Sequence, residues 1–211
     1  MLDSSERSES WRRAFRPELR AEAIGLAFQG WSVLPGTYPT ATGWAGRDGI
    51  EADGPQPVHT DWRQRVGTDA AQVATWWAGK PYSLLLATGA GVDAIEVDGD
   101  LGRRAARVLR TFGFPVPIAA TPESRWVFLT RSGATLHRDL VEHPDHAVTL
   151  RAEGDWIALP PSPVRHGVVH WRVKPEVCNW ALPHSRIVQD ALLEALDAPV
   201  HHMIGTLVAA D

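Results

Sequence analysis

The spacing of hydrophobic and polar positions predicts helices and strands along most of the chain. Leu19, Ala23 and Leu26 recur at helical spacing, which predicts a helix over residues 17–29. A second helix is predicted to start after an N-cap at Thr68, with Asp69 in its first turn. The same spacing predicts helices over residues 101–113 and 185–197.

Short apolar runs bounded by Gly and Pro predict the strands. They cover residues 31–35, 82–89, 92–97, 117–122, 124–132, 146–154, 155–162 and 168–173. Residues 36–57, rich in Gly, Pro, Thr and Asp, are predicted to form a long loop, a type of segment that is often functional. Strands and helices do not alternate strictly, so the predicted class is α+β, with a mixed sheet covered by helices.

The chain has 211 residues, a length that fits one domain. Residues 1–16 combine both charge signs with Ser and show no apolar period, which predicts a flexible N-terminal segment. A single domain is expected over residues 17–198. Residues 199–211 are expected to form a C-terminal tail.

Composition narrows the classes of function. The sequence has no apolar run long enough for a membrane span and no apolar leader, so a cytoplasmic protein without membrane contact is expected. The single cysteine excludes a disulfide framework and a cysteine zinc site. A net charge of −4 argues against a broad basic surface for nucleic acid but leaves room for a local basic groove.

The stretch LLLATGAGVDAIEVDGDLG, residues 84–102, contains a G-x-G pattern at Gly89 and Gly91. In a dinucleotide-binding fold such a turn leads into a helix. Here it leads into VDAIEV, a strand-like sequence, so a β-hairpin is predicted instead.

Two carboxylates near the end of this strand are candidate metal ligands. Glu96 and Asp98 are two residues apart and therefore face the same side of a strand. Adjacent carboxylates repel each other, and a bound Mg²⁺ or Mn²⁺ ion relieves that repulsion. The alternative interpretation is a polar strand end at the protein surface. The strand alone does not decide between them.

Two other sets of residues allow both a structural and a functional interpretation. Arg103, Arg107 and Arg110 share one helix face, which is either a solvated charged face, the favoured interpretation, or a stripe that faces phosphate. His143 and His146 in HPDH have no further ligands nearby, so a surface loop is favoured over a metal site.

Three segments in order carry a resemblance to a known family. They are WWAGKPYSLLLATGAGVDAIEVDGDLG, TPESRWVFL and GDWIALPPSPVRHGVVHW. Together they resemble the bifunctional DNA primase/polymerase (prim-pol) domain of the archaeo-eukaryotic primase superfamily. The similarity is greatest to its short, single-domain actinobacterial members. It implies a sheet related to RNA-recognition folds, and a nucleotidyltransferase that uses two Mg²⁺ or Mn²⁺ ions.

The resemblance assigns roles to individual residues. Glu96 and Asp98 occupy the family's D-x-D positions, as catalytic residues and metal ligands. Arg125 or Trp126 stands where the family has a phosphate-binding His, and Arg125 is the better nucleotide-binding candidate because guanidinium suits phosphate. Ser162 of the PPS segment is the second nucleotide-binding candidate.

The departures from the family pattern predict a weakened or lost catalytic site. Asp to Glu moves the carboxylate by about 1.3 Å, whereas metal–ligand distances tolerate only about ±0.2 Å. The family's third carboxylate falls near Thr149, and the candidates to replace it are Asp93 and Asp100. Arg151, Glu153 and Asp155 are expected to point elsewhere. The expected partners are nucleoside triphosphates or single-stranded DNA. The alternative is a non-catalytic regulatory or protein-interaction module built on the prim-pol fold.

Overall fold

The computed structural model describes residues 17–49, 53–66, 69–142 and 146–197. The predicted flexible N-terminal segment, the C-terminal tail, Thr68 and His143 lie outside these described residues. The first helix covers residues 17–28. The other helical elements are η1 (Trp62–Arg65), α2 (Ala70–Trp76), α3 (Gly99–Thr111), α4 (Arg138–Val141), η3 (Pro175–Cys178) and α5 (Ser185–Asp197).

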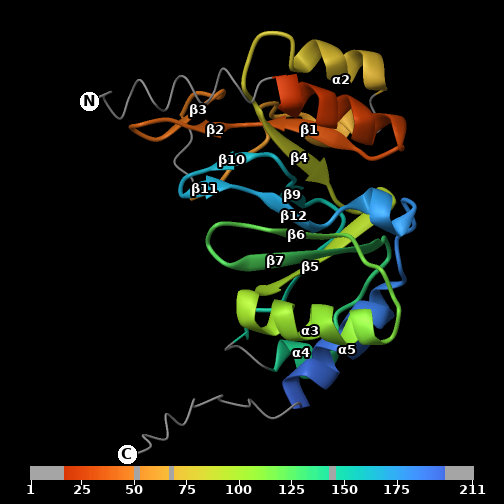
Figure 1. The fold of residues 1–211 in the computed structure, drawn as a ribbon. Coiled ribbons are helices and arrows are strands. Elements are labelled where there is room, and N and C mark those ends of the chain that lie inside the picture. The colour runs from red at the N-terminus through yellow and green to blue at the C-terminus, as the bar shows by residue number, and fades with distance from the viewer. Residues whose placement is uncertain (1–16, 50–52, 67–68, 143–145, 198–211) are drawn as a thin grey trace, which may run out of the picture.

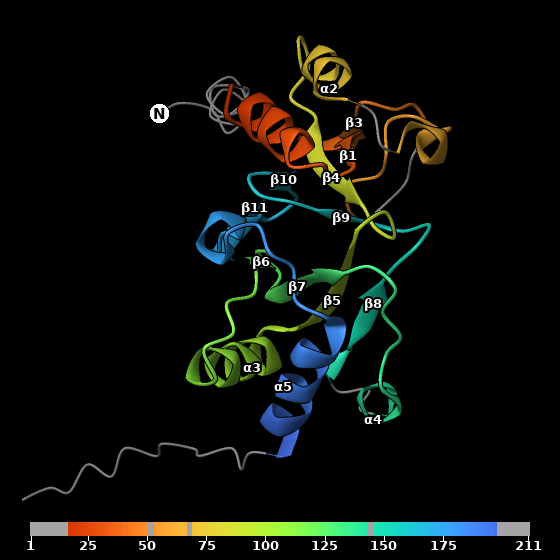
Figure 2. The ribbon, with the colours of Figure 1, turned by 90° about the vertical axis from the view of Figure 1, so that its right-hand side faces the viewer.

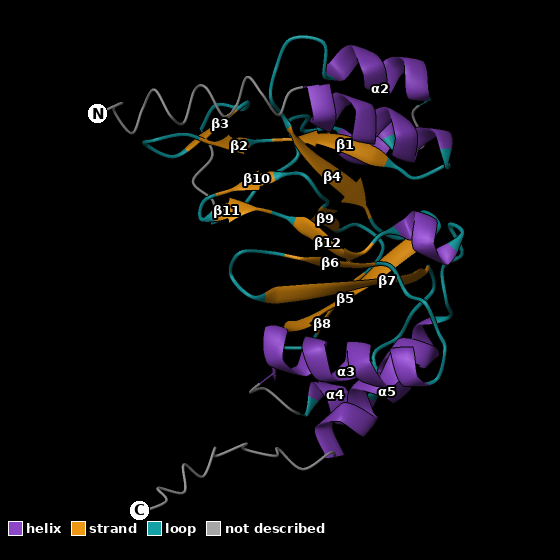
Figure 3. Cartoon of the chain, viewed as in Figure 1, coloured by secondary structure: helices purple, strands orange, loops and turns teal. Residues whose placement is uncertain are grey.

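Two sheets lie between two layers of helices (Figure 1, Figure 3). The three-stranded sheet has the order β1 (Val33–Gly36), β4 (Ser83–Ala87), β9 (Trp156–Ala158). The five-stranded sheet has the order β12 (His170–Val173), β6 (Ile118–Ala120), β7 (Arg125–Arg131), β5 (Val92–Asp98), β8 (Thr149–Arg151). Two short pairs complete the described strands: β2 (Tyr38–Pro39) with β3 (Trp44–Ala45), and β10 (Pro163–Val164) with β11 (Gly167–Val168). The described pairings are antiparallel, and the predicted α+β class is confirmed.

Each face of the five-stranded sheet packs against a separate apolar core because side chains alternate along its strands. Ile95 and Val97 of β5 pack with helices α3 and α5. Ala94 of the same strand packs with the core that includes helix 17–28 and β4. Glu96 has the same parity as Ala94, so it faces the three-stranded sheet and not the α3–α5 layer.

The predicted β-hairpin over the G-x-G pattern is wrong. Strand β4 belongs to the three-stranded sheet and β5 to the five-stranded sheet, so the turn carries the chain from one sheet to the other (Figure 2). Gly89 closes the turn through its N–H, which donates to the Val92 carbonyl at 2.9 Å. Its φ is +95°, and a Cβ there would lie 2.4 Å from the Glu153 Cα, so only glycine fits. Close backbone packing against Glu153 accounts for this glycine.

The main helices were predicted within two residues at each end, except at α2. Asp69 is the N-cap of α2: its side chain accepts from the N–H groups of Ala71 and Gln72 at 2.8 and 3.0 Å. The prediction had placed Asp69 inside the first turn. The predicted loop 36–57 contains the short β2–β3 pair, and residues 53–56 lie beside the site described next.

Candidate functional site

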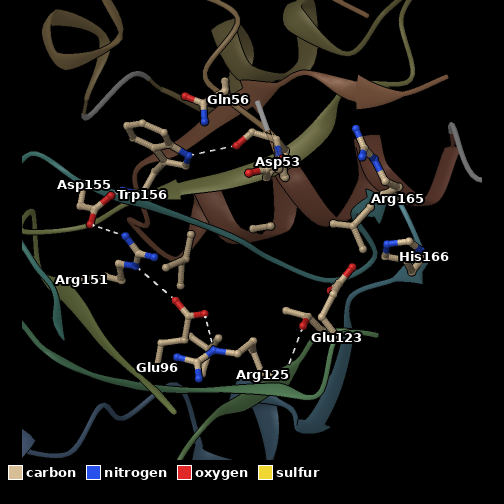
Figure 4. Close-up of a pocket in the computed structure, with 17 residues that line it drawn as sticks. Asp53, Gln56, Glu96, Glu123, Arg125, Arg151, Asp155, Trp156, Arg165 and His166 are labelled. Carbon is tan, nitrogen blue, oxygen red and sulfur yellow. Dashed lines mark hydrogen bonds and ion pairs between the residues drawn. The ribbon is translucent and has the colours of Figure 1, made fainter. Parts of the chain in front are cut away.

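A cavity of about 670 Å³ opens between the two sheets (Figure 4). Its ionisable lining residues are Asp53, Glu96, Glu123, Arg125, Arg151, Asp155, Arg165 and His166. These residues come from the 53–56 loop, from strands β5, β7 and β8, from the turn between β6 and β7, and from the turns around β9 and β10. The three arginines and four carboxylates of this lining nearly balance in charge, with His166 beside them.

Glu96 is held at the floor of the cavity by two arginines. Arg125 donates through Nε to Oε1 of Glu96 at 3.0 Å, and Arg151 donates through Nε to Oε2 at 3.2 Å. The side chain of Glu96 is only 18% exposed, so the carboxylate depends on these two guanidinium groups for its charge compensation. Both of its oxygens are therefore already engaged.

The register of the sheet explains why these residues meet. In β5–β8 the residue opposite Glu96 is Thr149, and Arg151 lies opposite Ala94. Thr149 and Arg151 thus share the face of Glu96, while Leu150 points into the other core. On the other side of β5, Val127 lies opposite Glu96, and Arg125 is two residues earlier on the same face.

Both arginines have second partners that fix their position. Nη2 of Arg125 donates to the Ala147 carbonyl at 2.7 Å. Nη1 of Arg151 donates to Oδ2 of Asp155 at 3.0 Å. Burial by itself lowers the pKa of Arg151, but the carboxylates of Asp155 and Glu96 outweigh it and raise the pKa above the ordinary value. The two cations are consequently preorganised on the floor of the cavity.

Asp98 does not line this cavity, although it follows Glu96 by two residues. It is the N-cap of α3, where Oδ1 accepts from the N–H groups of Asp100 and Leu101 at 2.8 and 3.0 Å. Its Oδ2 lies 2.6 Å from Nδ1 of His146. Burial raises the pKa of Asp98, but the hydrogen bonds from Leu101, His146 and Asp100 together outweigh it, so the pKa lies below its usual value.

Replacing Asp98 by Ala is expected to lower the free energy of unfolding by about 1 kcal/mol, and by up to about 2, because α3 loses its cap. Asn retains an oxygen that caps, so Asp98→Asn should cost less. Because the pKa of Asp98 in the folded protein lies below 3.8, its negative charge stabilises the fold above pH 3.8. This stabilisation is lost as the pH falls through the pKa of the folded state. Urea denaturation at pH 7 and pH 3 measures both effects. Equal losses for Ala and Asn at pH 7 would contradict the capping role.

The remaining residues singled out from the sequence lie elsewhere. Ser162 is buried, and its Oγ accepts from the Leu84 N–H at 2.7 Å and donates to the Leu84 carbonyl at 2.9 Å, which ties this loop to β4. Asp93 is also buried and accepts from the N–H groups of Gly89 and Ala134. Asp100 pairs with Arg103 and Arg104 on α3. Neither Asp93 nor Asp100 is in position to supply the third carboxylate.

The expectation that Arg151 and Asp155 point elsewhere was wrong, since both line the cavity. The sequence TLR, residues 149–151, could have predicted the position of Arg151, because an apolar residue separates two polar residues that share one face of the strand. The contact of His146 with Asp98 was also missed. It joins residues 48 positions apart, and no local pattern indicates it.

A comparison with protein families identifies the class. The family described as "Bifunctional DNA primase/polymerase, N-terminal" matches residues 23–200. The chain belongs to this family, which confirms the resemblance drawn from the sequence and indicates a function related to DNA primase/polymerase. No curated protein matches the chain significantly. No helix of the described residues is long and apolar enough to cross a membrane.

The residues at the D-x-D positions do not fit the divalent metals that this family generally uses. Both oxygens of Glu96 bond to guanidinium groups, and those of Asp98 bond to backbone N–H groups and His146. Asp155, another carboxylate of the cavity wall, is bonded to Arg151. Among the described residues no group of three or more His, Cys, Asp or Glu could hold a metal ion. Arg125 and Arg151 place positive charge directly beside Glu96, the first of the two candidate ligands.

Proposed function

We propose that this prim-pol family member binds the phosphate groups of a nucleoside triphosphate through arginines, without two-metal nucleotidyl transfer. The observation that carries the proposal is the convergence of Arg125 and Arg151 on Glu96 at the floor of a cavity of about 670 Å³. A pocket of this volume has the size of typical small-ligand sites. Guanidinium groups bind phosphate through paired hydrogen bonds and need no metal for it.

Both arginines keep donors that their carboxylate partners do not occupy. Arg125 uses Nε for Glu96 and Nη2 for Ala147, and Arg151 uses Nε and Nη1. Each guanidinium has five N–H donors, so each retains N–H groups that can bind a phosphate. Arg165 and His166 line the same cavity and are exposed, and they add donors at its rim (Figure 4).

The role proposed for Glu96 is that of an internal counter-ion. It holds the two guanidinium groups in place and, at the same time, competes with phosphate for them. Asp155 does the same for Arg151. Binding by the wild type is therefore expected to be modest, because four carboxylates line a cavity that has three arginines.

The experiment that tests this proposal is the binding of dATP after EDTA has removed divalent metal. Binding that persists in EDTA supports arginine-mediated recognition. Binding that requires Mn²⁺ would overturn it.

A second candidate function, a non-catalytic protein-interaction module, is supported by a different observation: an arginine-lined groove on the opposite face of the five-stranded sheet.

A further inference from the structure

A second groove, of about 580 Å³, lies on the other face of the five-stranded sheet. It runs between helix α3, the 113–116 loop, and strands β6 and β12. Strand β7 separates the two sites, because Arg125 and Val127 line the first cavity whereas Trp126, between them, lines the groove. The groove is thus distinct from the candidate nucleotide site.

The charge of this groove has one sign. Its charged lining residues are Arg103, Arg107, Arg110 and Arg172, and within the described part of the chain no Asp or Glu lines it. Arg103 has a long contact of 3.4 Å with Asp100, which is itself 62% exposed. Within the residues that the structure describes, no carboxylate forms an ion pair with Arg107 or Arg110. From Arg103 to Arg110 the stripe extends about 10 Å along α3, at about 1.5 Å per residue.

The rest of the lining is apolar and partly open to solvent. Leu109, Val116 and Val173 contribute to its floor. Phe114 and Val177, at its edge, are 48% and 67% exposed, and they are two of the five large hydrophobic side chains that the described residues expose. Exposed apolar surface of this kind marks interaction sites, and Arg is enriched at the centres of protein interfaces.

We infer that this groove binds an acidic amphipathic segment of a partner protein. Carboxylates spaced three to four residues apart on a partner helix would meet the arginine stripe of α3. The apolar face of the partner helix would cover Val173, Val177 and Phe114. The partner's charge is fixed by complementarity with four arginines that no lining carboxylate offsets.

The groove is less suited to single-stranded nucleic acid, which needs free aromatic faces for its bases. Trp126 is only 8% exposed, and the guanidinium of Arg172 lies 5.3 Å from the centre of its ring. Phe114 is the remaining aromatic side chain in the lining, and the other apolar members are aliphatic or Pro and Gly. Aliphatic surface is matched by Leu and Ile side chains.

Selection from a displayed library of random 15-residue peptides tests the inference. The library is selected on the full-length wild-type protein, with counter-selection on an Arg107→Glu/Arg110→Glu variant. The expected result is enrichment of peptides that carry Asp or Glu together with Leu, Ile or Phe at helical spacing. Failure to enrich any peptide that depends on the two arginines, or enrichment of peptides without acidic residues, would overturn the inference.

The best peptide is then synthesised with a fluorescent label, and its dissociation constant is measured by anisotropy. Arg107→Glu/Arg110→Glu is expected to weaken binding at least tenfold, and Val177→Asp severalfold. The matched control, Arg138→Glu/Arg186→Glu, makes the same charge change on exposed faces of α4 and α5 and should leave binding unchanged. If the reversal variant does not fold, Arg107→Gln/Arg110→Gln takes its place.

Two further arms separate this site from other ligands. An Arg125→Met/Arg151→Met variant should bind the peptide like the wild type, because the first cavity is not involved. An excess of a 15-nucleotide oligothymidylate should not displace the peptide. If the oligonucleotide displaces the peptide and its own binding depends on Arg107 and Arg110, the groove is a nucleic-acid site. That result would overturn the protein assignment.

Discussion

Replacing Glu96 by Gln is expected to tighten the binding of dATP about tenfold, equivalent to about 1.4 kcal/mol. Gln keeps the shape of Glu but removes the negative charge that competes with phosphate for Arg125 and Arg151. A metal ligand would behave in the opposite way, since its loss weakens metal-dependent binding. The sign of the change therefore distinguishes a counter-ion from a metal ligand.

Isothermal titration calorimetry of dATP in EDTA measures this effect. Glu142→Gln is the matched control, because it removes the same charge from a carboxylate that pairs with Arg138 outside the cavity. Its affinity for dATP should equal that of the wild type within about twofold. Weaker binding by Glu96→Gln, or Mn²⁺-dependent primer extension by the wild type that disappears in this variant, would show that Glu96 acts on metal.

The Arg125→Met/Arg151→Met variant is expected to lose at least a hundredfold in affinity for dATP. Hydrogen bonds to charged groups contribute about 1.5–3 kcal/mol each, and both guanidinium groups are removed here. Met retains much of the aliphatic length of Arg, so the substitution removes the positive charge and preserves most of the packing on the cavity wall. The same calorimetric titration reports the loss.

Two comparisons control that result. Arg138→Met/Arg186→Met removes two arginines that pair at exposed i, i+4 positions and should leave dATP binding unchanged. Arg125→Lys/Arg151→Lys keeps both charges but not the planar fork, and an intermediate affinity is expected. Unchanged binding by the Met variant, with its fold intact by circular dichroism, would place dATP elsewhere on the protein.

Local patterns predicted the helices better than they predicted the site. Helix α5 (Ser185–Asp197) was predicted to the residue, and α3 within two residues, because their apolar positions repeat at helical spacing. The N-cap of α2 is Asp69, one position after the predicted Thr68, because both residue types are favoured at N-caps and the sequence alone does not choose between them. The family was also recognisable, since its motifs are contiguous in sequence.

The pairing of strands and the surroundings of Glu96 depend on contacts that are distant in sequence. Arg151 meets Glu96 across 55 positions, through the register of β8 against β5. The β4–β5 hairpin was wrong because sequence alone shows a turn but not that the two strands enter different sheets. Asp98 shares the strand face of Glu96, but the α3 N-terminus and His146 bind its carboxylate.

The most direct test of the central claim is the dissociation constant of dATP for the wild-type protein, measured by calorimetry in EDTA and again in Mn²⁺. If Arg125 and Arg151 bind the phosphates, the two values should agree within about threefold. Binding that is measurable only with Mn²⁺ would contradict the account and would mean that Glu96 leaves its arginines to bind metal.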